Sequence, residues 1–304
     1  NDDNNILYWQ WQGGNIVRYY KKTGEFKQIR PYAEQAKDML RFNWNTPYTF
    51  GEKSRALYVG AQFLYRSADK GDTWQKISPD LTTNNPEKQK QEESGGLTVD
   101  NSTAENHCTI FTISESPLDA LVIWAGTDDG NLQVTIDGGK NWNNTIAGIA
   151  GLPANTWCSY VEASRFDKGT AYAVFDGHTQ GDKKPYVFKT TDYGKTWTSL
   201  SSDKIPTFCR VIKEDRKNKD LLFLGTEMGL YVSVDGGINW VRFKGNFPQV
   251  PVYDMLIHPA EDDLIVATHG RGVVIVDDIT ALRQITPQLL EQEVAFIEQK
   301  PYII

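Results

Sequence analysis

The stretch "SADKGDTW", residues 67–74, combines a hydroxyl, an acid, a glycine and a tryptophan within eight positions. Near-copies follow as "TIDGGKNW" (135–142), "TTDYGKTW" (190–197) and "SVDGGINW" (233–240). Successive copies begin 68, 55 and 43 residues apart. The shortest interval matches the roughly 40 to 50 residues of one propeller blade. The repeat therefore predicts a fold built from equivalent units.

The segments around each copy also correspond. Two apolar segments joined by a glycine-containing turn precede the motif, as in "LLFLGTEMGLYVSVDGG" from residue 221. A third apolar segment lies upstream, as in "FCRVIKED" from residue 208, and a fourth begins at the motif's tryptophan. Each unit is predicted to be four antiparallel strands with the motif between the third and fourth. A β-sandwich would not repeat the same unit with the same turn, so an all-β propeller is favoured.

The units divide the chain into blades. We expect a partial blade at 6–29, blades at about 42–78, 107–147, 157–200 and 208–245, a partial blade at 252–285, and a strap at 286–304 that leaves the propeller. The first unit lacks a first strand and has Phe26 where tryptophan is expected. Open blade faces are unusual on soluble monomers. We therefore expect the C-terminal part of a larger propeller assembly, whose remainder, or a partner protein, covers the open faces.

Each motif residue can be explained by a structural role in the turn or in the packing of the sheets. Aspartate can accept hydrogen bonds from backbone N–H groups in a turn, glycine supplies a positive φ, and tryptophan buries a ring between sheets. Around a ring the four aspartates would be far apart, whereas the carboxylates of a glycosidase lie within about 10 Å of each other. The residues predicted to be structural are Ser67, Asp69, Gly71, Trp74, Thr135, Asp137, Gly139, Trp142, Thr190, Asp192, Gly194, Trp197, Ser233, Asp235, Gly237 and Trp240.

The pattern S/T-x-D-x-G-x-T/N-W resembles the Asp-box, or bacterial neuraminidase repeat, of sialidases, xyloglucanase-type glycosidases and sortilin-like propellers. Further segments, among them "RFNWNTPY" and "IVATHGRGVVIVDD", look like the large secreted bacterial proteins described as sortilin-like or glycosyl-hydrolase-like repeat proteins. The resemblance extends from about residue 6 to residue 285. It implies a β-propeller in a secreted, periplasmic or cell-surface bacterial protein, but it implies no particular substrate, because the family name records the repeat.

A ligand site is expected where the turns between second and third strands meet the starts of the first strands. Polar and aromatic side chains converging on one mouth are typical of such a site. Tight turns also favour Asp and Gly for backbone reasons alone, so each acid has a simpler explanation as a turn former. The expected ligand-binding residues are His107, Asp128, Trp157, His178, Arg210, His269 and Arg271, and the candidate catalytic carboxylates are Asp129, Asp176 and Glu227.

Two function classes remain. The favoured one is a binding or scaffold module for a peptide, protein or glycan, because no acid pair stands out from the turn formers. The alternative is a xyloglucanase-like glycoside hydrolase, which needs two carboxylates about 5 to 9.5 Å apart, with Trp157 and Trp124 as candidate sugar platforms. Trp124 has the simpler explanation of a residue in the core of its strand. A sialidase is disfavoured, because Arg210 stands alone where that family carries an arginine triad.

Composition excludes other classes. The formal charge of −7 and the short basic stretches argue against nucleic-acid binding. No apolar run approaches the roughly 18 to 20 residues of a membrane span. No metal or other cofactor is expected, because the four histidines show no ligand spacing. Cys108, Cys158 and Cys209 recur at one position of three units and are expected to be small apolar residues.

Overall fold

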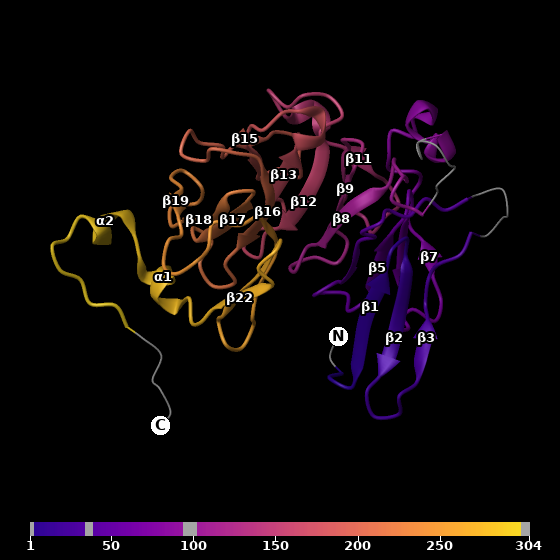
Figure 1. Ribbon diagram of the computed structural model, residues 1–304, viewed down its shortest axis with the longest axis horizontal. Coiled ribbons are helices and arrows are strands. Elements are labelled where there is room, and N and C mark those ends of the chain that lie inside the picture. Colours follow the sequence, from indigo (N-terminus) through magenta and orange to yellow (C-terminus); the bar gives the residue numbers. More distant parts are fainter. Residues whose placement is uncertain (1–2, 34–38, 94–101, 299–304) are drawn as a thin grey trace.

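The computed structural model describes residues 3–33, 39–93 and 102–298. Within these ranges the chain is almost entirely β-structure, and its strands form six antiparallel sheets that follow one another in chain order (Figure 1). Four sheets have four strands, and the first and last have three. Every sheet is a meander in which consecutive strands pair. The predicted β-propeller is confirmed, and we number its sheets as blades 1 to 6.

The bounds of the elements are as follows. Blade 1 contains β1 (Ile6–Trp11), β2 (Asn15–Tyr20) and β3 (Phe26–Gln28); blade 2 contains β4 (Tyr48–Phe50), β5 (Leu57–Gly60), β6 (Leu64–Ser67) and β7 (Gln75–Lys76). Blade 3 contains β8 (Ile110–Glu115), β9 (Ile123–Thr127), β10 (Leu132–Thr135) and β11 (Asn143–Asn144); blade 4 contains β12 (Trp157–Ala163), β13 (Ala171–Asp176), β14 (Tyr186–Thr190) and β15 (Thr198–Ser199). Blade 5 contains β16 (Cys209–Glu214), β17 (Leu222–Thr226), β18 (Gly229–Ser233) and β19 (Val241–Arg242); blade 6 contains β20 (Val252–Ile257), β21 (Leu264–Thr268) and β22 (Val273–Val276). The helical turns are η1 (Pro86–Lys88), η2 (Gln91–Glu93), η3 (Ile146–Gly148), η4 (His178–Gln180), α1 (Thr280–Gln284) and α2 (Pro287–Leu290).

The repeated motif forms the same hydrogen-bonded turn in all four copies. In the first copy, the Ser67 hydroxyl donates to Asp69 at 2.7 Å and accepts the Gly71 N–H at 2.8 Å. Asp69 also accepts the backbone N–H and the hydroxyl of Thr73, at 2.8 and 2.6 Å. The other copies make equivalent bonds, with Asn141 and Asn239 in place of threonine in two of them.

The same turn contacts the preceding blade. The Trp74 indole N–H donates to the carbonyl oxygen of Ile29 at 2.8 Å, and Trp142 and Trp240 make the equivalent bond. Gly71 has a φ of +92°, and a Cβ there would lie 2.6 Å from the Ile29 side chain. Glycine is thus needed both for the backbone conformation and for the close approach of the blades. Trp197 differs, because its buried N–H has no partner among the described residues.

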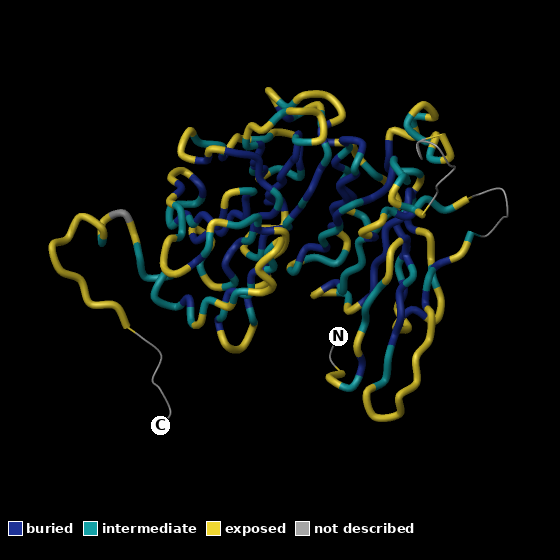
Figure 2. Tube along the Cα trace, viewed as in Figure 1, coloured by how far each residue is buried: buried dark blue, intermediate teal, exposed yellow. Residues whose placement is uncertain are grey.

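Apolar side chains fill the spaces between neighbouring sheets. The exposed residues lie mainly in loops, in the short outer strands and in the C-terminal segment (Figure 2). Cys108, Cys158 and Cys209 are fully buried and unpaired, as expected of small apolar residues. Blade 6 is open on one face, where Leu256, Ile265 and Ile275 face each other across its three strands. Leu256 and Ile275 are 54% and 55% exposed.

Candidate functional site

Each first strand of blades 3 to 6 begins opposite the end of the second strand. Trp157 pairs with Asp176 in blade 4, and Ile110 pairs with Thr127 in blade 3. We call the end of the propeller at which first strands begin the top face and the opposite end the bottom face; the names refer to connectivity, not to the view in Figure 1. The residues predicted from the sequence to bind ligand all lie at the top face.

Arg210 is the centre of the top face of blades 4 and 5. Its guanidinium donates to Glu227 at 2.8 and 3.2 Å and to Asp176 at 3.4 Å. Asp176 is completely buried, and it also lies 2.7 Å from Nδ1 of His178. Four sequence-predicted residues are thus brought into one network, and its two carboxylates are joined through one arginine.

A row of ring contacts crosses the same region, and we call it the aromatic band. Phe111 packs edge-on against Trp157, whose ring centroid is 6.2 Å from that of His178. His178 stacks on Phe208 at 4.9 Å, and Tyr253 stacks on His269 at 5.4 Å. The guanidinium of Arg210 lies between these two stacks, 5.0 Å from the Phe208 ring and 4.3 Å from the Tyr253 ring. The band therefore runs from blade 3 to blade 6.

The exposure of the band increases toward blade 6. Phe208 is buried, Trp157 and His178 are half-buried, and Tyr253 and His269 are exposed, with Tyr253 47% accessible. An exposed ring held from behind by an arginine is a rigid platform for a ligand. Arg271 is also exposed, and it makes no hydrogen bond or ion pair with any described residue. The blade 6 end of the band is thus the part that a ligand can reach.

The blade 3 candidates serve local structure. Asp128 accepts the backbone N–H and hydroxyl of Thr109 and the amide of Asn43, and His107 lies 3.8 Å from it. Burial raises the pKa of Asp128 above the ordinary value of a carboxyl. The structure places these residues on the side of the top face toward blade 2, in contacts separate from the Arg210 network.

Asp129 makes hydrogen bonds to other residues than Asp128 does. It is completely buried, and its carboxylate accepts the hydroxyls of Thr83 and Thr127 at 2.6 and 2.5 Å. Through Thr83 it fixes the segment that connects blade 2 to blade 3. Trp124 is also completely buried, which rules it out as a sugar platform, because a buried ring in the core of a blade cannot contact a ligand.

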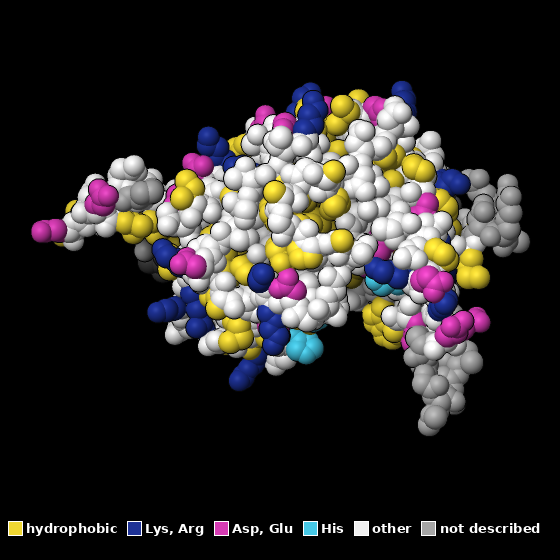
Figure 3. Space-filling view, turned by 90° about the horizontal axis from the view of Figure 1, so that it is seen from above, with side chains coloured by type: hydrophobic (Ala, Val, Ile, Leu, Met, Phe, Trp, Pro, Cys, Tyr) yellow, Lys and Arg dark blue, Asp and Glu magenta, His cyan; other side chains and the backbone are white. Residues whose placement is uncertain are grey.

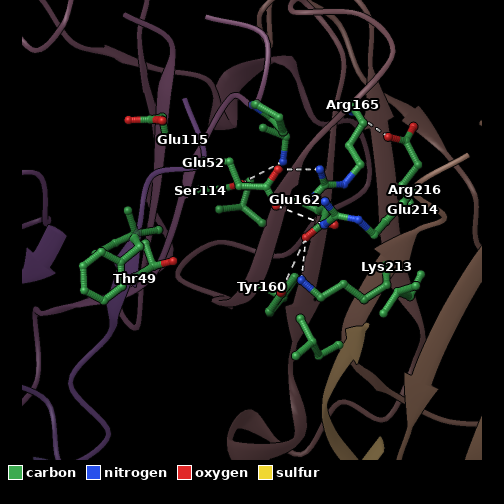
Figure 4. Close-up of a pocket in the computed structure, with 17 residues that line it drawn as sticks. Thr49, Glu52, Ser114, Glu115, Tyr160, Glu162, Arg165, Lys213, Glu214 and Arg216 are labelled. Atoms are coloured by element: carbon green, nitrogen blue, oxygen red, sulfur yellow. Dashed lines mark hydrogen bonds and ion pairs between the residues drawn. The ribbon is translucent and has the colours of Figure 1, made fainter. Parts of the chain in front are cut away.

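A cavity of about 530 Å³ opens at the bottom face, around the ends of the first strands (Figure 4). None of the sequence-predicted site residues lines it. Its charged side chains come from several blades, and in Figure 4 Glu52 points toward Arg165 and Arg216 whereas Glu115 lies apart from them. Its charged and hydroxyl-bearing lining residues are Thr49, Glu52, Ser114, Glu115, Tyr160, Glu162, Arg165, Lys213, Glu214 and Arg216.

The cavity's charges are paired within the protein. Glu52, in the turn between β4 and β5, forms ion pairs with Arg165 and Arg216 of blades 4 and 5. The hydrogen bond from Arg165 outweighs partial burial and lowers the pKa of Glu52 to about 2. Burial disfavours the charge on Lys213, but Glu162 at 2.8 Å outweighs this effect and raises the pKa of the ammonium group. The Glu52 pairs connect blade 2 to blades 4 and 5, and the Lys213–Glu162 pair connects the neighbouring blades 4 and 5.

Several residues of these sites escaped the sequence reasoning. Phe208 and Tyr253 complete the aromatic band; Phe208 precedes a cysteine just as Trp157 does, and that repeated pair was the available signal. Glu115 and Glu214 hold neighbouring blades together. Glu115 accepts the Tyr58 hydroxyl at 2.7 Å and two N–H groups of blade 2, and Glu214 is bound equivalently by blade 4.

Other classes of site find no support in the described parts of the chain. No group of three or more His, Cys, Asp or Glu side chains could hold a metal ion. None of the helices placed there is long and apolar enough to cross a membrane. On the face seen in Figure 3, basic and acidic side chains are interspersed rather than gathered by sign.

No protein-family model and no curated protein matches this chain. Solved structures do match. The GH74 xyloglucanase from Xanthomonas campestris aligns with 94% of this chain at a TM-score of 0.61 and 18% identity, over 45% of its own length. The extracellular domain of a putative hybrid two-component system from B. thetaiotaomicron aligns with 91% of this chain at a TM-score of 0.56 and 15% identity, over 33% of its own length. YCF48 bound to D1 peptide aligns with 91% of this chain at a TM-score of 0.52 and 14% identity, over 83% of its own length.

These similarities show the fold, and the class of protein is a β-propeller. The chain spans less than half the length of the xyloglucanase and of the extracellular domain. At identities of 18% and below, the neighbours do not transfer a substrate or a ligand to this chain.

Proposed function

We propose that this chain is a ligand-binding propeller module that recognises a peptide, protein or glycan across the top face of blades 4 to 6. The single observation that carries the proposal is the aromatic band. Its exposed end, Tyr253 and His269, is backed by Arg210, so the rings are oriented before any ligand arrives. Preorganised aromatic platforms beside a few polar groups suit both sugar rings and peptide side chains.

The polar groups beside the band match this role. The Glu227 side chain is one-third exposed and is held by Arg210, so it offers a fixed acceptor next to the rings. Arg271 offers an exposed donor on blade 6. Fixed hydrogen-bonding groups at the edge of an apolar platform set the orientation of a bound ligand.

The hydrolase alternative is weaker at this site. A glycosidase needs one carboxylic acid to protonate the leaving group and a second carboxylate on the sugar. Asp176 and Asp129 are completely buried and already accept hydrogen bonds within the protein, and Asp176 shares Arg210 with Glu227. Carboxylates in these contacts position other groups rather than react with a sugar.

We further propose that the chain belongs to the Asp-box propellers and acts as a secreted, periplasmic or cell-surface bacterial protein. The four equivalent motif turns support the first part, and the extracellular domain among the structural neighbours agrees with the second. The open face of blade 6 supports the proposal that further blades of the same propeller, or a partner protein, cover it.

The test is a binding screen with a glycan array, a peptide array and a panel of plant and bacterial polysaccharides. The variants are Tyr253→Ala and His269→Ala, with Tyr32→Ala as the matched control, because Tyr32 is exposed and lies outside the band. We expect the first two variants to lose most of the binding and the control to retain it. Equal binding by all three would refute the assignment to the aromatic band, and released reducing ends would favour the hydrolase.

A further inference from the structure

The turns that follow the first strands of blades 2 to 6 share one hydrogen bond. The residue directly after the strand donates its N–H to the residue directly before the second strand, as Ser164 does to the Thr170 carbonyl oxygen. The equivalent donors in the other blades are Gly51, Ser116, Asp215 and His258. The next position of each turn is therefore equivalent around the axis, and it is occupied by Glu52, Pro117, Arg165, Arg216 and Pro259.

Three of these five side chains meet at the cavity of the bottom face (Figure 4). Arg165 donates to both carboxylate oxygens of Glu52, with Nη1 2.6 Å from Oε2, and Arg216 donates to Oε1 at 3.1 Å. The turn itself does not require arginine, because blades 3 and 6 have proline at the same position. Two neighbouring blades thus carry arginines that the fold of the turn does not explain.

The charges at this end of the cavity do not balance. Lys213 is paired with Glu162 at 2.8 Å. The other two acids of the lining, Glu115 and Glu214, accept hydrogen bonds from backbone N–H groups and tyrosine hydroxyls of neighbouring blades. Two guanidinium groups therefore share the single carboxylate of Glu52. Among the described residues, Glu52 is the only hydrogen-bond acceptor of the Arg216 side chain.

Glu52 is also the most accessible member of this cluster. Its side chain is 43% exposed, whereas those of Arg165 and Arg216 are 20% and 26% exposed. The backbone of its turn is held separately, because Glu115 accepts the N–H groups of the two residues that follow Glu52. The Glu52 carboxylate can therefore rotate into solvent while the turn stays in place. Both arginines would then face the cavity without an acceptor.

We propose that Arg165 and Arg216 bind the carboxylate of a small organic acid, which enters the bottom-face cavity and displaces the Glu52 side chain. The planar forks of two guanidinium groups match a carboxylate, and Glu52 occupies the place that the ligand carboxylate would take. The volume of about 530 Å³ is that of a small-molecule site. Phe50 and Ile113 supply apolar lining for the body of the acid.

This site is independent of the proposed top-face ligand site. The cavity contains no residue of the aromatic band or of the Arg210 network, so either proposal can fail while the other holds. A carboxylate of this kind can belong to a free organic acid or to the C-terminus of a peptide, and the experiment separates these two sources.

The probes are phenylacetate and N-acetylphenylalanine, each compared with its primary amide, which has the same shape without the charge. Binding is measured by isothermal titration calorimetry at low salt, because screening weakens contacts between exposed charges. The proteins are the unmodified chain, Glu52→Gln, and Glu52→Gln combined with Arg216→Gln. The matched control combines Glu52→Gln with Lys219→Gln, because Lys219 is an exposed cation of the same blade that does not line the cavity.

We expect Glu52→Gln to bind one of the acids at least roughly tenfold more tightly than the unmodified chain, because the internal carboxylate no longer competes. Adding Arg216→Gln should weaken this binding at least roughly tenfold, and adding Lys219→Gln should not. Tighter binding of phenylacetate would indicate a free acid as the ligand, and tighter binding of N-acetylphenylalanine would indicate a peptide C-terminus. Neither amide should bind comparably.

Three results would overturn the proposal: no binding of either acid to Glu52→Gln, binding no tighter than that of the unmodified chain, or equal effects of Arg216→Gln and Lys219→Gln. Amides that bind as well as the acids would overturn it too. If Glu52→Gln does not fold, thermal melts of the unmodified chain decide. A higher melting temperature with an acid than with its amide supports the proposal, and equal melting temperatures refute it.

Discussion

The aspartates of the four repeated turns are the clearest case of a residue whose role is structural. Each accepts hydrogen bonds from the hydroxyl two residues before it and from the residue four positions after it. The bonds from Thr196 and Thr190 lower the pKa of Asp192 to about 2. A pKa below the ordinary value of an aspartate means that the charged form is the one that the turn stabilises.

Replacing Asp192 by Ala should therefore lower the melting temperature while the folded fraction keeps its ligand-binding capacity. The contribution of the Asp192 carboxylate to stability should be complete above about pH 4, the ordinary pKa of an aspartate, and should disappear as the pH falls toward about 2. Thermal melts of Asp192→Ala and of the exposed control Asp203→Ala, from pH 2 to pH 7, check this. A constant difference across that range would contradict it.

A comparison of two glycines can distinguish the effect of backbone strain on stability from the effect of close packing. Gly139 and Gly151 both have positive φ, +98° and +79°. A Cβ on Gly139 would lie 2.4 Å from the Ile77 carbonyl oxygen of the preceding blade, whereas Gly151 has nothing within 4 Å. Gly151→Ala should cost about 1 kcal/mol through strain alone. Gly139→Ala should cost clearly more in urea denaturation, and equal losses would show that the blades can separate there without penalty.

At the scale of elements, the top-face network shows how a strand end can be both structural and functional. An acid in a turn at a strand end, as the sequence presents Asp176, can usually be replaced with little effect on the fold. The structure shows instead that Asp176 is a buried partner of Arg210, itself only 10% exposed, while Glu227 lies at the surface. Loss of either acid leaves Arg210 with fewer hydrogen-bond acceptors. Only the loss of Asp176 removes an acceptor that water cannot easily replace, because Asp176 is buried.

Asp176→Ala is therefore expected to destabilise the chain by about 3 to 5 kcal/mol, the usual effect of removing one partner of a buried ion pair. Glu227→Ala should cost far less, because Glu227 is partly solvated. Denaturant unfolding of the two variants measures the difference, and a smaller loss for Asp176→Ala would show that Arg210 is held mainly by the rings of Phe208 and Tyr253.

At the scale of the whole molecule, the Glu52 contact ties blade 2 to blades 4 and 5 across the axis. Glu52→Gln removes this charge and should lower the melting temperature at pH 7. The folded-state pKa of about 2 lies below the ordinary value of 4.5, so the stabilisation should be present above about pH 4.5 and lost toward pH 2. It should also weaken with added salt, because Glu52 is partly exposed.

The matched control is Glu25→Gln, an exposed glutamate on blade 1. Its melting temperature should follow that of the unmodified chain at every pH and salt concentration. If Glu52→Gln behaved like this control, the cross-axis ion pairs would contribute nothing measurable to the ring.

The sequence by itself determined the repeat, the four-stranded unit, the turn residues and the end of each blade at which polar residues gather. These are local properties: a turn needs its acceptor and its glycine, and strand alternation shows in a few residues. Only the tertiary structure decided that Arg210 joins Asp176 to Glu227 and that Phe208 and Tyr253 complete the aromatic band. Those facts depend on which side chains of different blades face each other around the axis. The spacing of residues along the sequence does not give the distances between such side chains.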